Sequence, residues 1–336
     1  GPAVLGLISG VGEIRAFAEL GIVFLLFIIG VELKPRRLWL MRRLVFGMGT
    51  LQVVLTGVLL TLLLWLYGTE MRPALILGLG LALSSTAFVL QLLMDRKELT
   101  MPHGRASIAV LLLQDLAVVP LLALVTILAL PEMDISDSVA LVLVEIVAAI
   151  AAVIIAGRYL LQPVRRRVAL YGVPETFLAA ALLLVLGVGA LMEHVGMSMS
   201  MGAFIAGLLI ANSEFRHQVL ADIQPFRGLL LGLFFMSVGM TLDLHALLES
   251  PLRILVMLLL LLLIKALILW LLANLYGLGK RVSIQMGLLL SQSGEFGFVL
   301  FGAALHADLF SMQLYQEAVL VVVLSMVVTP WLLQLM

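Results

Sequence analysis

Eleven runs of apolar residues, most of them long enough to cross a bilayer, constrain this chain more than any other feature. The hydrocarbon core holds no water to hydrogen-bond a backbone, so segments that cross it fold as helices. Apolar residues make up 63% of the chain, against about 45–50% in soluble domains. We therefore expect an all-α polytopic membrane protein, with one membrane domain over residues 1–336. The expected spans are 16–33, 44–67, 74–94, 106–130, 139–161, 176–193, 198–212, 226–243, 252–274, 284–305 and 317–336.

The distribution of basic residues predicts the orientation of these spans. Sixteen of the 20 Lys and Arg residues fall in one set of alternate loops, Arg15, Arg72 and Arg253 fall in the other set, and Lys265 lies inside a span. Because Lys and Arg accumulate on the cytoplasmic side, we expect a periplasmic N-terminus and a cytoplasmic C-terminus.

Charge and cysteine content exclude several classes of function. Basic and acidic residues number 20 each, so no surface for nucleic acid is expected. The absence of cysteine excludes disulfides, a thiol nucleophile and cysteine-ligated metal centres. The sequence contains no recognisable cluster of metal ligands and no nucleophile–base pattern, so we expect neither an enzyme nor a cofactor in this chain.

Four charged residues lie deep inside predicted spans: Asp115, Glu145, Lys265 and Glu295. Such a charge costs at least about 2.5–3.5 kcal/mol on insertion scales, so it marks a transport pathway or a paired partner. Acidic residues near span ends, including Glu317, are better explained by solvation. For Glu145, an oligomer interface and a pair across helices both stay open.

Asp115 follows Gln114 in an otherwise apolar run. A buried carboxylate beside an amide suits a dehydrated monovalent cation, and it suits a proton too, because burial favours the neutral acid. The alternative is a hydrogen-bonded Asp that braces two helices.

Lys265 needs a carboxylate partner, Asp115 or Glu295, unless it loses its proton. That pair would be either static or broken when a cation binds.

Small polar residues interrupt two spans near their middles. Ser84, Ser85 and Thr86 divide span 74–94, and the stretch 291–297 (SQSGEFG) divides span 284–305. Secondary transporters use such broken helices as ion sites. The two spans run in opposite directions and both continue into Phe-Val-Leu, which favours an inverted repeat; close helix packing is the alternative. The residues expected to coordinate a cation are Ser84, Ser85, Thr86, Gln292, Ser293 and Glu295.

Stretches distributed over nearly the whole chain resemble the membrane domain of Kef-type potassium/proton antiporters, within the cation/proton antiporter superfamily. They are 27–33 (FIIGVEL), 81–87 (LALSSTA), 110–115 (VLLLQD), 201–207 (MGAFIAG), 223–235 (IQPFRGLLLGLFF) and the Glu295 motif. In this resemblance Gln114 and Asp115 occupy the ion site, with potassium bound at Asp115, and the amide is expected to favour potassium.

The resemblance implies an NhaA-like fold of thirteen helices, with two crossed broken helices in a core domain that moves against a scaffold. About two N-terminal helices would then be missing here. A C-terminal nucleotide-binding domain, which would bind adenine nucleotide or NAD and glutathione, would also be absent. The resemblance further implies a homodimer in the bacterial inner membrane and a cytoplasmic regulatory domain or ancillary subunit as a partner.

The polar stretch 213–225 lies outside the predicted spans on the cytoplasmic side. By itself it is better explained as a connecting helix at the interface than as a ligand site. The resemblance makes it a regulatory loop, in which His217, Asp222 and Arg227 are candidate residues.

Together these features predict a secondary transporter that exchanges potassium for protons by alternating access and mediates potassium efflux. One titrating carboxylate suggests electroneutral exchange, with Lys265 neutralising the empty Asp115. Two alternatives stay open: a ligand-gated, channel-like potassium pathway and a non-transporting membrane sensor or scaffold.

Overall fold

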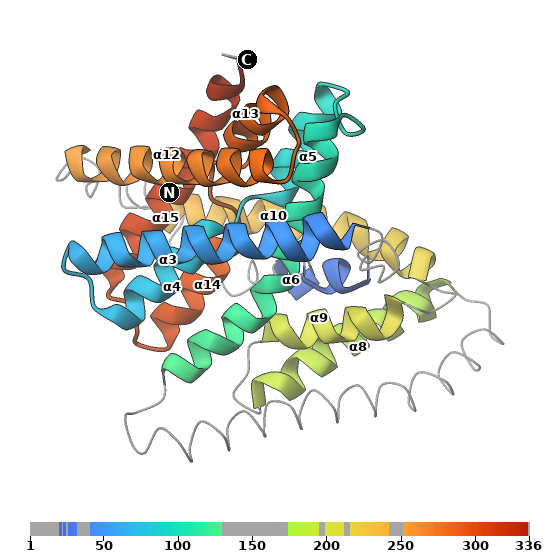
Figure 1. Cartoon of the computed structure of the whole chain (residues 1–336). Helices are drawn as coiled ribbons and strands as arrows, with labels where there is room; N and C mark the ends of the chain where they lie inside the picture. Colours follow the sequence, from blue (N-terminus) through green and yellow to red (C-terminus); the bar gives the residue numbers. More distant parts are fainter. Residues whose placement is uncertain are drawn as a thin grey trace. The chain divides into compact units, whose positions relative to one another are not determined.

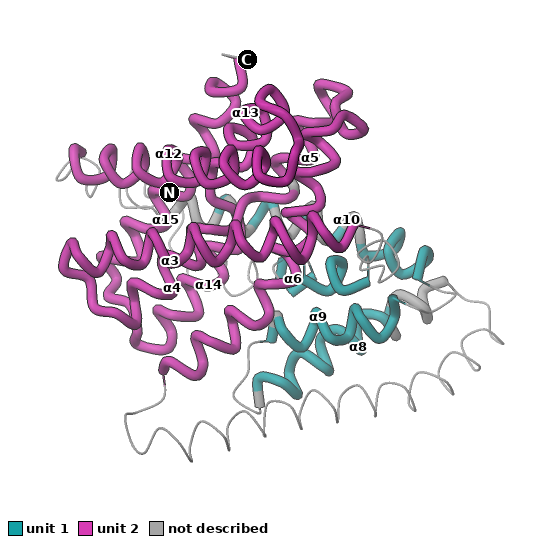
Figure 2. Tube along the Cα trace, viewed as in Figure 1, with its two compact units in different colours: residues 1–34, 130–241 teal, residues 35–129, 242–336 magenta. Residues whose placement is uncertain are grey.

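In the computed structural model, most of the described residues belong to helices (Figure 1). The described residues are 20–31 except 22 and 25, 41–129, 174–194, 199–211, 216–241 and 251–334. The predicted span 139–161, with Glu145, lies outside them. Two compact units divide the chain, one formed by residues 1–34 and 130–241 and the other by residues 35–129 and 242–336 (Figure 2).

The first unit contains a helical stretch within 20–31 together with α8 (Pro174–His194), α9 (Met199–Ala211) and α10 (Arg216–Thr241). Its core includes Phe27 and Ala206, both fully buried. Gly30 and Gly207 face one another there: a Cβ on Gly207 would collide with the carbonyl oxygen of Phe27. Small residues therefore let two backbones approach closely, as is common between membrane helices.

Helix α10 differs from the expected arrangement at its start. The sequence predicts a polar stretch at 213–225, best explained as a connecting helix, before a separate span at 226–243, whereas one continuous helix runs from Arg216 to Thr241. His217, Asp222 and Arg227 all lie on α10, and their regulatory role stays a prediction. The segment is helical, as the connecting-helix interpretation proposed.

The second unit has the same order of elements in each of its two halves. The first half contains a π-helical segment η1 (Arg43–Gly49), α3 (Thr50–Leu66), α4 (Met71–Ala82), α5 (Thr86–Asp95) and α6 (Pro102–Leu128). The second half contains α12 (Pro251–Leu275), α13 (Lys280–Leu289), α14 (Phe296–His306) and α15 (Met312–Gln334). In both halves a long helix precedes two short ones, and another long helix follows.

Among the described residues, four helices are long and apolar enough to cross a membrane, all in the second unit: Arg43–Leu66, Pro102–Leu128, Pro251–Leu275 and Met312–Gln334. They correspond to the predicted spans 44–67, 106–130, 252–274 and 317–336. Spans 74–94 and 284–305 are each divided into two short helices, which confirms the predicted interruptions. The NhaA-like fold and the full number of spans stay predictions.

Candidate ion-binding site

The first break separates α4 from α5. Leu83 and Ser85 have extended backbone conformations, with ψ of 144° and 116°. Ser and Thr side chains compete for backbone hydrogen bonds, which favours helix ends over helix interiors. Ser85 is the N-cap of α5, and its hydroxyl accepts a hydrogen bond from the backbone N–H of Phe88 at 3.1 Å. The sequence Ser-Ser-Thr thus ends one helix and starts the next.

The second break, between α13 and α14, binds the first one directly. The backbone N–H of Gly294 donates to the carbonyl of Leu83 at 3.0 Å. The Ser84 hydroxyl donates to the carbonyl of Leu290 at 2.8 Å, and the Ser85 N–H donates to Oε1 of Gln292 at 3.3 Å. Backbone groups that the two breaks leave unpaired are therefore satisfied by each other, as a membrane interior requires.

Gly294 makes this close contact possible. A Cβ at this position would lie 2.5 Å from the carbonyl carbon of Ser84 and 2.6 Å from the backbone nitrogen of Ser85. Both are backbone atoms, which have little freedom to move aside. A side chain here would therefore separate the breaks.

Helix α6 places Gln114 and Asp115 against the first break. Oε1 of Gln114 accepts a hydrogen bond from the backbone N–H of Ser84 at 2.9 Å. The Thr86 hydroxyl donates to Oδ1 of Asp115 at 2.7 Å, and Asp115 is only 5% exposed. Thr86 is the first residue of α5, so the carboxylate lies at the positive end of that helix dipole. Gln114 braces the break, whereas Asp115 faces the start of α5.

Lys265, on α12, is completely buried and binds both breaks. Its Nζ donates to the carbonyls of Leu81 at 3.0 Å, Leu83 at 2.9 Å and Gln292 at 2.7 Å. An ammonium has three N–H donors, so all three are used. The carbonyls lie where α4 and α13 end, at the negative ends of their dipoles. Among the described residues, the hydrogen-bond partners of Lys265 are therefore carbonyl groups; the sequence predicts either a carboxylate partner or the loss of its proton.

Gln52, on α3, is a site residue that the sequence analysis missed. It is fully buried; its Oε1 accepts from Nε2 of Gln114 at 2.6 Å, and its Nε2 donates to the carbonyl of Ala82 at 3.0 Å. Gln52 thus connects the amide beside Asp115 to the end of α4. The signal in the sequence was an uncharged amide inside an apolar run, and it was missed because only charged residues inside spans were considered there.

In the second break, Nε2 of Gln292 and Oγ of Ser293 are buried and have no hydrogen-bond partner among the described residues. The backbone N–H of Ser293 donates to the hydroxyl of Ser325 on α15 at 3.0 Å, a second residue that the sequence analysis missed. Among described residues, the free hydroxyl of Ser293 is an oxygen that this arrangement leaves available to a cation or a water molecule.

Two further acidic residues considered in the sequence, Glu295 and Glu317, belong to the last two helices of the second unit. Glu295 is 2% exposed at the start of α14. Glu317, on α15, is 5% exposed and forms an ion pair with Arg253 at 3.1 Å. The prediction that solvation accounts for Glu317 is therefore wrong. A span-end position does not reveal that a neighbouring helix supplies a cation.

The predicted regulatory residues belong to the other unit. On α10, His217 is exposed and Asp222 is half-buried. Arg227 is on the same helix. The structure thus brings together predicted ion-site residues in the second unit, and the predicted regulatory residues all lie on α10 of the first unit.

This geometry suits a small cation without its hydration shell. Carboxylate and hydroxyl oxygens, of Asp115 and Thr86, meet at the start of a broken helix, and a further hydroxyl belongs to the opposing break. Comparison with known proteins agrees with this chemistry: the family model of the transmembrane domain of sodium/hydrogen exchangers matches residues 1–335. The chain belongs to this family.

Members of the family are transporters rather than enzymes. The chain is 46% identical over 337 residues to the glutathione-regulated potassium-efflux system protein KefC of Klebsiella pneumoniae, covering 100% of this chain and 54% of that protein. It is also 46% identical over 334 residues to KefC of Escherichia coli K12, covering 99% of this chain and 54% of that protein. The chain therefore spans about half the length of these relatives.

Proposed function

We propose that this chain is the ion-exchanging part of a potassium/proton antiporter that mediates potassium efflux across a bacterial inner membrane. Family membership supports cation/proton exchange, and the names of the relatives support potassium. One observation carries the proposal: a buried Asp115 accepts a hydrogen bond from Thr86 at the start of a helix that is broken inside the membrane.

In the proposed cycle, Asp115 binds either a proton or a potassium ion. Potassium would displace the Thr86 hydrogen from Oδ1, so that the hydroxyl oxygen becomes a second ligand. Ser293 would add an oxygen from the opposing break. Gln114 would keep its brace on Ser84 and hold Asp115 in place; the resemblance to Kef proteins supports this role for the pair.

Lys265 would set the electrostatics of this cycle. As an ammonium, it would place a positive charge against carbonyls of both breaks. A transfer of the ammonium from a carbonyl to Asp115 in another conformation would make it the charge partner that the sequence predicts. A bound potassium ion would reverse that transfer.

We further propose that exchange occurs by alternating access, with one potassium ion for one proton. The second unit, which holds both breaks, would be the moving core, and the first unit would be the scaffold. The chain would form a homodimer with its N-terminus outside and its C-terminus in the cytoplasm.

Proton and potassium fluxes in proteoliposomes of the full-length protein test the proposal. Asp115→Asn should abolish potassium-driven proton movement, because a neutral amide cannot exchange a proton. Asp95→Asn is the matched control: Asp95 lies on the exposed end of α5 and bonds to Gln91. Coupled exchange that survives in Asp115→Asn would refute the assignment.

The pH dependence gives a second test with a defined sign. Protons and potassium compete for one carboxylate, so the apparent KM for potassium should rise as the pH falls, while the maximal rate at saturating potassium changes less. Potassium flux that is indifferent to pH would instead favour a channel-like pathway. Specific binding of a cytoplasmic partner without any flux would favour a sensor.

The names of the relatives also describe glutathione regulation, and we propose the same for the full-length protein. His217, Asp222 and Arg227 would receive the signal on α10. Substituting all three with Ala should leave ungated exchange intact and remove its response to glutathione. Loss of basal exchange would contradict a purely regulatory role.

A further inference from the structure

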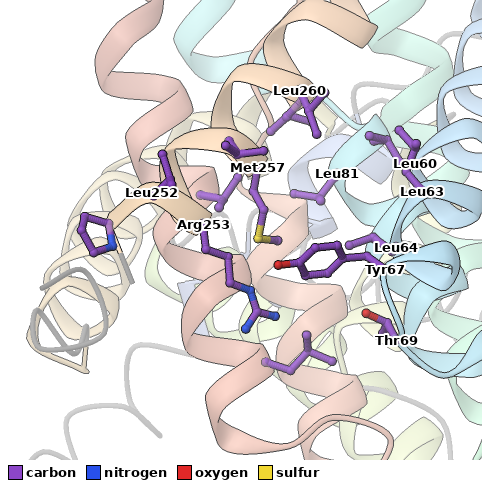
Figure 3. A pocket seen from close by; sticks show the side chains of 15 residues that line it. Leu60, Leu63, Leu64, Tyr67, Thr69, Leu81, Leu252, Arg253, Met257 and Leu260 are labelled. Carbon is purple, nitrogen blue, oxygen red and sulfur yellow. The ribbon is translucent and has the colours of Figure 1, made fainter. Parts of the chain in front are cut away.

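A groove of about 610 Å³ lies on the second unit (Figure 3). Its walls come from α3, α12 and α15, with Leu81 from α4 at its base. This volume falls within the range of about 300–1,000 Å³ typical of small-molecule sites. The lining residues are Leu60, Leu63, Leu64, Tyr67, Thr69, Leu81, Pro251, Leu252, Arg253, Val256, Met257, Leu260, Leu261, Leu314 and Val321.

The groove is polar at one end and apolar along the rest. Tyr67, Thr69 and Arg253 lie at one end in Figure 3, and Leu60 and Leu260 lie at the other. The guanidinium of Arg253 lies over the Tyr67 ring, 5.5 Å from its centroid. This distribution matches a ligand with a charged head and a hydrocarbon tail.

The direction of the groove matches the depth of one bilayer leaflet. Its polar end lies where α3 ends and α12 begins, and aromatic and basic residues favour that membrane–water boundary. From Arg253 to Leu261 the groove follows α12 for eight residues, or about 12 Å at the helical rise. Half of a hydrocarbon core is about 15 Å. A tail in this groove would therefore lie parallel to the acyl chains of its own leaflet.

Charge complementarity selects the head group. Arg253 forms an ion pair with Glu317, but the two side chains differ in exposure: Arg253 is 37% exposed and Glu317 is 6% exposed. The carboxylate is therefore covered, whereas more than a third of the Arg253 side chain, which lines the groove, stays exposed. An Arg side chain binds phosphate oxygens through its fork of N–H groups.

We propose that this groove is a binding site for a membrane phospholipid, with its phosphate on Arg253 and one acyl chain along the leucines of α3 and α12. The acyl chain of the lipid would end against Leu81, whose carbonyl binds Lys265. The bound lipid would thus pack against the helix end that holds the first break.

Native mass spectrometry of the full-length protein tests this site, with dioleoylphosphatidylglycerol as the probe. Leu260→Trp fills the groove and should weaken lipid binding about tenfold, which corresponds to about 1.4 kcal/mol. Leu263→Trp is the matched control, because Leu263 lies on the same helix, is 65% exposed and does not line the groove. Equal lipid binding by the two variants would overturn the proposal.

A double variant tests the head group. Arg253→Gln with Glu317→Gln removes both charges, so no buried carboxylate loses its partner. It should weaken phosphatidylglycerol binding about tenfold, as expected for a charge-assisted contact, and leave dioleoylglycerol binding unchanged. Equal losses for both lipids, or unchanged binding of both, would overturn the phosphate assignment. An unaltered melting temperature of each variant establishes that folding is retained.

Discussion

Lys265 illustrates how a membrane interior uses a charged residue. Its Nζ donates hydrogen bonds to three carbonyls that the two breaks leave without a helical partner. One side chain therefore satisfies backbone groups of both breaks, as water would outside a membrane. The charge is stabilised because it lies at the negative ends of two short helices. Within the part of the chain that the structure describes, the satisfaction of backbone carbonyls explains the burial of Lys265.

Lys265→Met tests this clamp. The substitution keeps an unbranched side chain but removes all three donors, so we expect the free energy of unfolding to fall by about 2–4 kcal/mol. Thermal unfolding in detergent measures the change. Lys265→Arg keeps the charge with a different donor geometry and should give an intermediate loss. An unchanged melting temperature for Lys265→Met would contradict the clamp.

Gln52 should act as a positioning residue for the ion site. Gln52→Leu preserves most of the volume but leaves Nε2 of Gln114 without its 2.6 Å acceptor. We expect a stability loss of about 1–2 kcal/mol and a KM for potassium that rises more than the maximal rate falls. Gln91→Leu, on the exposed side of α5, is the control. Equal behaviour of the two variants would exclude a positioning role.

At the scale of elements, the contact between the two breaks is the decisive feature. The break between α4 and α5 and the break between α13 and α14 exchange three hydrogen bonds through Gly294, Ser84 and Ser85. Neither broken helix is complete alone, because each leaves backbone groups that water cannot reach. The pair is therefore expected to fold cooperatively.

Gly294→Ala should disrupt this contact, since its Cβ would lie 2.5 Å from a backbone carbon of Ser84. We expect a lower melting temperature and loss of exchange. Gly302→Ala is the matched control: it lies on α14 with no atom within 4 Å of the added Cβ. That substitution should be neutral or raise stability by up to about 1 kcal/mol through helix propensity. Tolerance of Gly294→Ala in both assays would contradict the close approach.

At the scale of the whole molecule, a single exchanging carboxylate predicts that no net charge moves in a cycle. A net charge would couple exchange to the membrane potential by about 2.3 kcal/mol per 100 mV. We therefore expect equal exchange rates in proteoliposomes held at different membrane potentials, provided that the potential is set by an ion other than potassium. A steep dependence of the rate on potential would require a second moving charge.

The sequence by itself determined the membrane class, the two interruptions and the residues near them. These are local properties: apolar length sets a span, and Ser, Thr and Gly weaken a helix where they occur. The charged residues Asp115 and Lys265 were also recognisable, because burial makes them costly.

Only the tertiary structure decided what these residues contact. Lys265 binds carbonyls far along the chain, Gln52 reaches Gln114 on another helix, and Glu317 pairs with Arg253. Each of these partners depends on which helices become neighbours. A sequence pattern shows which residues are polar, but it does not show which of them lie next to each other. Helix packing selects among them, because every buried donor and acceptor needs a partner at hydrogen-bond distance.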